Sequence, residues 1–102
     1  DRRQVYAANL AMVELIDDQF GRILAALEET GQADNTFVVF MSDHGEMLGE
    51  HGLDFNHFGI YDQVIRIPMI VVAPGLPLKK NKVEAQVRLM DIPATVMDYL
   101  LI

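Results

Sequence analysis

Residues 35–57, NTFVVFMSDHGEMLGEHGLDFNH, join an apolar run to a cluster of carboxylates and imidazoles, and this stretch decides the fold. The apolar run, residues 37–41, is rich in β-favouring side chains, which predicts a strand buried on both faces of a largely parallel sheet. In open α/β sheets, ligands bind beyond the carboxyl ends of the strands, and this run leads into Asp43, His44 and Gly45. Gly45 allows the backbone to pass close to a ligand. The pattern therefore predicts that Asp43 and His44 belong to a ligand site.

The flanking sequence alternates helical and strand patterns. Residues 3–30 carry apolar side chains at three- and four-residue steps, which predicts a long helix that packs on the core. Residues 46–62 lack sustained periodicity and are expected to form a loop that carries the site. Residues 68–72 are expected to form a second apolar strand, adjacent or nearly adjacent to the first, and residues 83–89 alternate as a short half-buried strand does. A last helix is expected, with Asp91 as its N-cap residue.

Composition limits the classes of protein to which the chain can belong. It has 102 residues, enough for one domain, and its apolar runs are far shorter than the ~20 residues needed to cross a bilayer. The formal net charge of −7 argues against a nucleic-acid surface, which needs a basic stripe. The absence of cysteine excludes a disulfide framework. We therefore expect a soluble globular segment that binds neither nucleic acid nor membrane.

Several sequence blocks resemble the sulfatases of the alkaline-phosphatase superfamily. The main ones are SDHGE at residues 42–46, LGEHG at 48–52, IRIPMIV at 65–71 and APG at 73–75, with further likeness in MVELIDD at 12–18 and LMDIPAT at 89–95. One SDHG alone would be a weak signal, but blocks in family order with near-family spacing make chance a poor explanation. The resemblance implies an α/β, alkaline-phosphatase-like sheet with flanking helices, of which residues 1–102 form a partial domain.

The resemblance also implies roles for three residues. Asp43 and His44 occupy positions of metal ligands in the family, and His57 occupies the position of a lysine or histidine that approaches the ester oxygens. The implied cofactor is a divalent metal, calcium by family, while a carboxylate with an imidazole also suits Mn²⁺ or Zn²⁺. A donor at His57 would stabilise charge on the leaving oxygen. The alternatives to these functional roles are structural: Asp43 would be a turn residue, and His57 would be a loop histidine without a catalytic role.

Three other loop residues are given structural interpretations. His51 recurs in the family and is predicted to be structural. Glu46 and Glu50 are expected to be loop carboxylates, with the orientation of His44 or His51 as the alternative role.

A nucleophile motif is missing from the chain. The resemblance implies attack on sulfur or phosphorus by a nucleophile generated from Cys or Ser in a Cys/Ser-x-Pro-x-Arg motif, together with a further acidic pair of metal ligands. The sequence has no cysteine, and its only serine, Ser42, belongs to the SDHG block. Residues 1–102 are therefore expected to be the C-terminal part of a sulfatase catalytic domain. This segment should be inactive without the remainder of that domain and should expose strand edges that favour self-association.

The implied function is metal-dependent hydrolysis of a small anionic sulfuric ester. Within the superfamily, the alternatives are a phosphoethanolamine transferase, which also carries SDHGE, LGE and a later histidine, and a phosphonate or phosphodiester hydrolase. A non-catalytic binding domain that retains the fold is an alternative of a different class. The presence of the nucleophile motif upstream would separate an enzyme from such a domain.

Overall fold

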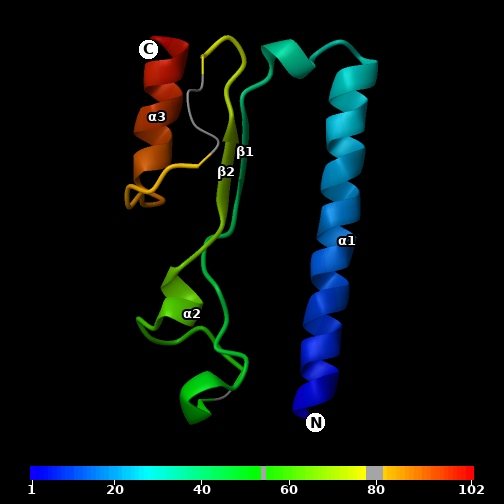
Figure 1. The fold of residues 1–102 in the computed structure, drawn as a ribbon, viewed down its shortest axis with the longest axis vertical. Helices are drawn as coiled ribbons and strands as arrows, with labels where there is room; N and C mark the ends of the chain where they lie inside the picture. Colours follow the sequence, from blue (N-terminus) through cyan, green and yellow to red (C-terminus); the bar gives the residue numbers. More distant parts are fainter. Residues whose placement is uncertain (54, 78–81) are drawn as a thin grey trace.

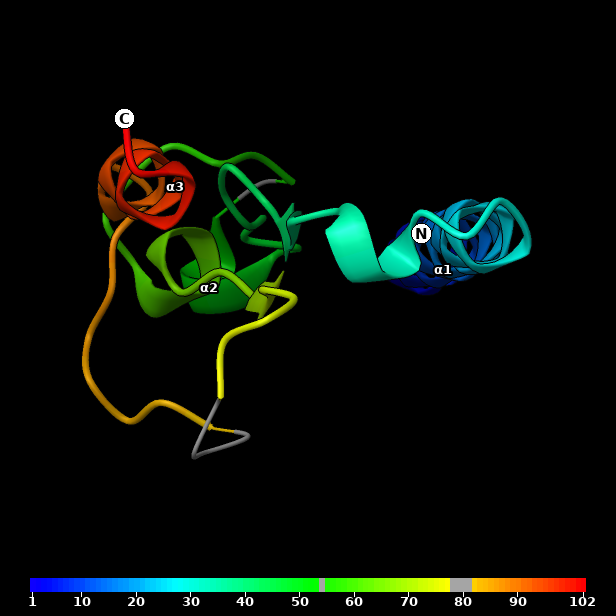
Figure 2. The same ribbon diagram turned by 90° about the horizontal axis from the view of Figure 1, so that it is seen from above.

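The computed structural model describes residues 1–53, 55–77 and 82–102 (Figure 1). In chain order its elements are the helix α1 (Arg2–Glu29), a 3-10 turn (Ala33–Asn35), the strand β1 (Val38–Met41), a second 3-10 turn (Glu50–Gly52), the one-turn helix α2 (Asp62–Ile65), the strand β2 (Met69–Val72) and the helix α3 (Asp91–Leu100). The chain is thus α/β, and its two-stranded sheet lies between α1 and α3 (Figure 1, Figure 2). Within the described ranges, no helix combines the length and apolarity that a membrane span requires.

The helix α1 confirms the long helix predicted over residues 3–30. Its N-cap residue Asp1 accepts a hydrogen bond from a first-turn amide at 3.1 Å, and Gly31 follows its end at φ 67°, a conformation that glycine adopts without strain. The rings of Phe20 and Phe40 connect α1 to the sheet, with centroids 4.9 Å apart. However, no residue of α1 is buried. Packing of this helix on a core is therefore wrong for the described chain, because two strands offer too little surface to cover its apolar stripe.

The strands β1 and β2 confirm the two predicted apolar strands and their adjacency, but they pair antiparallel. Val38 lies opposite Val72, and Met41 lies opposite Met69. The expected largely parallel sheet is wrong for this pair. An apolar run indicates burial, whereas the connection sets strand direction, and the loop 42–68 returns the chain alongside β1. Burial on both faces is not reached either, since β1 is half-buried and its last residue is exposed.

The helix α3 confirms the last predicted helix and lies on the side of the sheet opposite α1 (Figure 2). The rings of Phe37 and Tyr99 have centroids 4.6 Å apart, and the Tyr99 hydroxyl donates to the Pro74 carbonyl at 2.7 Å. The prediction of Asp91 as N-cap is wrong by one position, because Asp91 is the first helical residue. Its carboxylate accepts a hydrogen bond from the Arg88 amide at 2.8 Å, outside the helix, rather than from the first turn.

Residues 83–89 form no strand in the described structure, so this prediction is wrong. An alternating pattern produces a strand only where a neighbouring backbone pairs with it, and among the residues that the structure describes β1 and β2 pair only with each other. Val83 and Val87 are 69% and 52% exposed. The segment instead borders a cleft of about 590 Å³ between the sheet and α3.

Few apolar side chains are buried in the described ranges: Met47, Val64 and Ala73. Met47, at 0% exposure, anchors the loop that follows β1. Val64 belongs to α2, which sequence periodicity could not predict because the helix is a single turn. The Val64 carbonyl accepts a hydrogen bond from the Gly45 amide, so this small core adjoins the turn that carries Asp43 and His44.

Candidate metal and anion site

The carboxyl end of β1 runs directly into a turn that carries Asp43 and His44. The Ser42 hydroxyl donates to the His44 carbonyl at 2.6 Å, and the His44 amide donates to the Asp43 carboxylate at 2.9 Å. That amide is the main cause that holds the pKa of the exposed Asp43 carboxyl below its ordinary value. Asp43 is therefore an anion at neutral pH, and its oxygens are hard donors for a cation.

His44 presents one defined nitrogen to this carboxylate. Its Nδ1 lies 3.0 Å from the Gly45 carbonyl oxygen, and since a carbonyl only accepts, Nδ1 carries the proton and the neutral ring keeps its lone pair on Nε2. Nε2 lies 3.7 Å from Oδ2 of Asp43. Metal–ligand bonds of ~2.0–2.6 Å allow two ligand atoms to lie up to roughly 4–5 Å apart, so the pair fits one divalent ion. The Gly45 carbonyl would fix the orientation of the imidazole.

Gly45 holds this turn against α2. Its amide donates to the Val64 carbonyl at 2.8 Å, and a Cβ at this position would collide with the Gln63 carbonyl oxygen. The sequence suggested that Gly45 lets the backbone pass close to a ligand. In the structure, the group that lies close to Gly45 is the backbone of α2. Its φ is not positive, so the close approach alone excludes a side chain. The positions of Asp43 and His44 therefore depend on the contact between the turn and α2.

The loop after Gly45 folds back and brings His57 to the same turn. The Met47 amide donates to the Asn56 carbonyl at 2.9 Å, which closes the loop. The rings of His44 and His57 then stack, with centroids 4.2 Å apart and planes inclined by 27°. The structure thus brings the predicted metal ligand and the predicted anion contact side by side, while their roles stay predictions.

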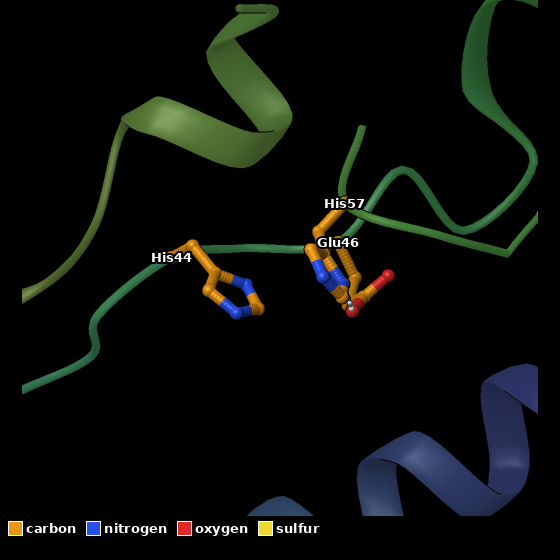
Figure 3. Close-up of side chains that lie close together, drawn as sticks. All are labelled: His44, Glu46 and His57. Carbon is orange, nitrogen blue, oxygen red and sulfur yellow. Dashed lines mark hydrogen bonds and ion pairs between the residues drawn. The ribbon is translucent and has the colours of Figure 1, made fainter. Parts of the chain in front are cut away.

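Glu46 contacts His57 directly, as Figure 3 shows. The distance from Oε1 of Glu46 to Nδ1 of His57 is 2.9 Å. Because an ionised carboxylate only accepts, Nδ1 carries the proton and Nε2 is left free for another partner. Sequence reasoning missed this contact, since it offered His44 or His51 as the partner of Glu46. No periodicity relates positions 46 and 57, which meet only through closure of the loop.

His44, Glu46 and His57 also form a group that could hold a metal ion. One ligand atom from each lies within 4.8 Å of the other two. Asp43 is not a member of this group. In the hydrogen bond between Glu46 and His57, Nδ1 of His57 carries a proton. A metal ion that bound to Nδ1 would have to displace this proton and break the hydrogen bond. The ligand roles of Asp43 and His44 and the anion contact of His57 therefore stay predictions beside this group.

His51 lies outside this group. Its ring stacks on that of Tyr61, with centroids 4.6 Å apart and planes inclined by 21°. Its φ of 54° places it in the left-handed region, which shapes the turn after Gly49. These contacts support the structural interpretation of His51.

A cleft of about 540 Å³ opens beside the turn, with Asp43 and His44 on its wall. Much of the rest of its lining is apolar and includes Val64, Ile65 and Ile67. Pockets of this kind, with a few polar groups beside an apolar surface, suit ligands that combine one charged group with one apolar group.

Comparison with known proteins identifies the class of protein that carries this site. The sequence model of the sulfatase family matches residues 1–102, and the chain belongs to this family, which is part of the alkaline-phosphatase superfamily. An arylsulfatase of Clostridium perfringens is 40% identical over 101 residues, which cover 95% of this chain and 21% of the relative. The multifunctional alkaline phosphatase superfamily protein PehA of Trinickia caryophylli is 35% identical over 99 residues, which cover 96% of this chain and 19% of the relative. Arylsulfatase K of Gallus gallus is 35% identical over 96 residues, which cover 94% of this chain and 18% of the relative.

The chain spans about a fifth of the length of these relatives. No solved structure gives a significant match. The comparisons therefore establish the family and leave the roles of individual residues to be argued from the site.

Proposed function

We propose that this chain supplies one wall of the active site of a metal-dependent sulfuric ester hydrolase. The observation that carries the proposal is the stack of His44 on His57, beside Asp43, in a chain of the sulfatase family. Cleavage of an anionic ester needs a cation and a hydrogen-bond donor near the same group of oxygens. The two stacked imidazoles, one facing Asp43 and one bonded to Glu46, would place a metal ligand and a hydrogen-bond donor side by side.

In this proposal each side chain has a distinct task. Asp43 and His44 would hold the metal, with Oδ2 and Nε2 as the candidate ligand atoms. Calcium is the first expectation by family, and Mn²⁺ and Zn²⁺ are alternatives suited to an imidazole ligand. A bound divalent ion would polarise the ester and offset its negative charge. His57 directs Nε2 to an ester oxygen, and a hydrogen bond donated from there would strengthen as charge develops in the transition state. The cleft beside Asp43 would accept the organic group of the ester.

The nucleophile and the remaining metal ligands would come from outside residues 1–102. The chain has no cysteine, and the hydroxyl of its only serine, Ser42, donates to the His44 carbonyl. Two ligands are too few for a closed metal site. We therefore regard the chain as the C-terminal part of a catalytic domain with an alkaline-phosphatase-like sheet, in which further strands extend β1 and β2. Below, "full-length protein" means the complete polypeptide that would contain this segment.

Turnover by the full-length protein tests the proposal. An activated aryl sulfate and an aryl phosphate diester are offered separately, with Ca²⁺, Mn²⁺ or Zn²⁺ added in turn. We expect multiple turnovers of the sulfate ester, lost in Asp43→Ala and kept in Glu50→Gln, whose exposed carboxylate lies in the same loop but outside the His44–Glu46–His57 group. Preference for the diester would favour the phosphodiesterase alternative. Metal binding without turnover of either ester would favour the non-catalytic domain.

A further inference from the structure

We propose that Glu46 is a positioning residue that holds His57 with its Nε2 directed towards the substrate anion. The contact itself is independent of the proposed function, whereas its catalytic meaning rests on that function. The proposal gives Glu46 a partner other than the two that the sequence suggested, which were His44 and His51.

Stacking alone cannot decide which nitrogen of His57 faces the substrate. The rings of His44 and Phe58 lie near the imidazole, with centroid distances of 4.2 and 5.4 Å. Such ring contacts restrain the plane of the imidazole, but they are nearly unchanged when the ring flips by half a turn and exchanges its edges. The 2.9 Å hydrogen bond from Nδ1 to Oε1 of Glu46 exists in only one of these two orientations. Glu46 is therefore the group that selects Nε2 as the free nitrogen.

The backbone on both sides of Glu46 is fixed, so its carboxylate is preorganised. The preceding residue, Gly45, donates to the Val64 carbonyl at 2.8 Å, and the following residue, Met47, is fully buried and donates to the Asn56 carbonyl at 2.9 Å. The side chains of Glu46 and His57 remain 37% and 47% exposed. At such exposure a charged hydrogen bond contributes little to stability, so its main effect is on orientation.

Kinetics of Glu46 variants of the full-length protein test this role. Loss of a side chain that orients a functional histidine costs roughly 10- to 100-fold, so Glu46→Ala should lower kcat by about that factor, with a smaller change in KM and undiminished metal content. Glu46→Gln keeps an acceptor oxygen at the same place and should recover most of the loss. Glu50→Ala, the matched control in the same loop, should retain the turnover of the wild type.

A double-mutant cycle separates positioning from an independent effect. In a His57→Ala background, Glu46→Ala should cause no further loss of kcat, because its effect passes through the missing ring. Full additivity of the two losses, or wild-type kcat in Glu46→Ala, would overturn the inference. A fall in metal content in Glu46→Ala would also overturn it and would assign His44, Glu46 and His57 to a metal site.

Nitrogen-15 NMR of the histidine rings tests the contact without any need for activity. The His57 ring should carry a hydrogen-bonded proton on Nδ1 in the wild type, and Glu46→Ala should lose this signature. An unchanged His57 spectrum in that variant would contradict the inference even in a protein that hydrolyses sulfate esters. Conversely, the expected spectral change in a protein without ester turnover would contradict the proposed function and leave the Glu46–His57 contact confirmed.

Discussion

Replacement of Gly45 with alanine should displace the site without removing any of its functional side chains. The added methyl group would overlap the Gln63 carbonyl oxygen, and the carbonyl carbon lies only 3.1 Å from the same point. Both atoms belong to the backbone of α2, which can relieve the overlap only by moving away from the turn. That movement would break the 2.8 Å hydrogen bond from the Gly45 amide to the Val64 carbonyl.

The cost of Gly45→Ala can be worked out from these contacts. Overpacking costs about 1–3 kcal/mol and a lost backbone hydrogen bond about 0.5–1.5 kcal/mol, so the free energy of unfolding should fall by roughly 2–4 kcal/mol. A displacement of about 1 Å in Asp43 and His44 should lower kcat by ~10²-fold. Urea denaturation and aryl sulfate turnover of the full-length protein measure the two effects.

Gly21→Ala is the matched control for this substitution. Gly21 lies inside α1, where an added Cβ meets nothing within 4 Å. Alanine there should stabilise the helix by about 0.5–1 kcal/mol and leave turnover unchanged. If Gly45→Ala were as stable and as active as the wild type, the close approach of the turn to α2 would be refuted.

Three further predictions concern the site and the isolated chain. His57→Ala in the full-length protein should lower kcat by ~10²–10³ with metal content intact, the scale of one lost oxyanion donor, and unchanged turnover would return His57 to a structural role. Because the His44 amide holds the pKa of Asp43 below its ordinary value, this carboxylate should keep its charge as the pH falls through the ordinary range of an aspartate and lose it only at lower pH; protonation at the ordinary aspartate pKa in a carboxylate NMR titration would contradict this. The isolated 102-residue chain should hydrolyse neither ester. It should also self-associate through its open strand edges and the apolar side of α1, where Ile16 and Ile23 are 55% and 58% exposed. Sedimentation velocity measures the association, and an active monomer would contradict both expectations.

Local sequence patterns were sufficient to predict the elements that position the site. Apolar residues at helical spacing predict α1 and α3, and two compact apolar runs predict β1 and β2, because each of these signals depends only on neighbours along the chain. Strand direction was not predictable in this way, since a fully apolar run looks the same in parallel and antiparallel sheets. Residues 83–89 failed as a strand for a related reason: their alternation carries no information about whether a partner strand is present.

The sequence predicted only the part of the candidate site whose residues are neighbours along the chain. Asp43 and His44 follow the end of a predicted strand, so their proximity was readable from the sequence. The contact of Glu46 with His57 was not, because it depends on the turn from Gly45 to Met47 and on the loop closure at Asn56, neither of which has a periodic signal. The barrier to a side chain at Gly45 comes from α2, a single helical turn that periodicity cannot detect.

Metal analysis of the full-length protein tests whether Asp43 and His44 are ligands of one divalent ion. Bound metal is measured after gel filtration for the wild type, Asp43→Ala and the control Glu50→Gln. We predict that the wild type and Glu50→Gln retain the metal and that Asp43→Ala loses most of it, together with aryl sulfate turnover. Undiminished metal content in Asp43→Ala would contradict the assignment of this pair and of the active-site wall built on it.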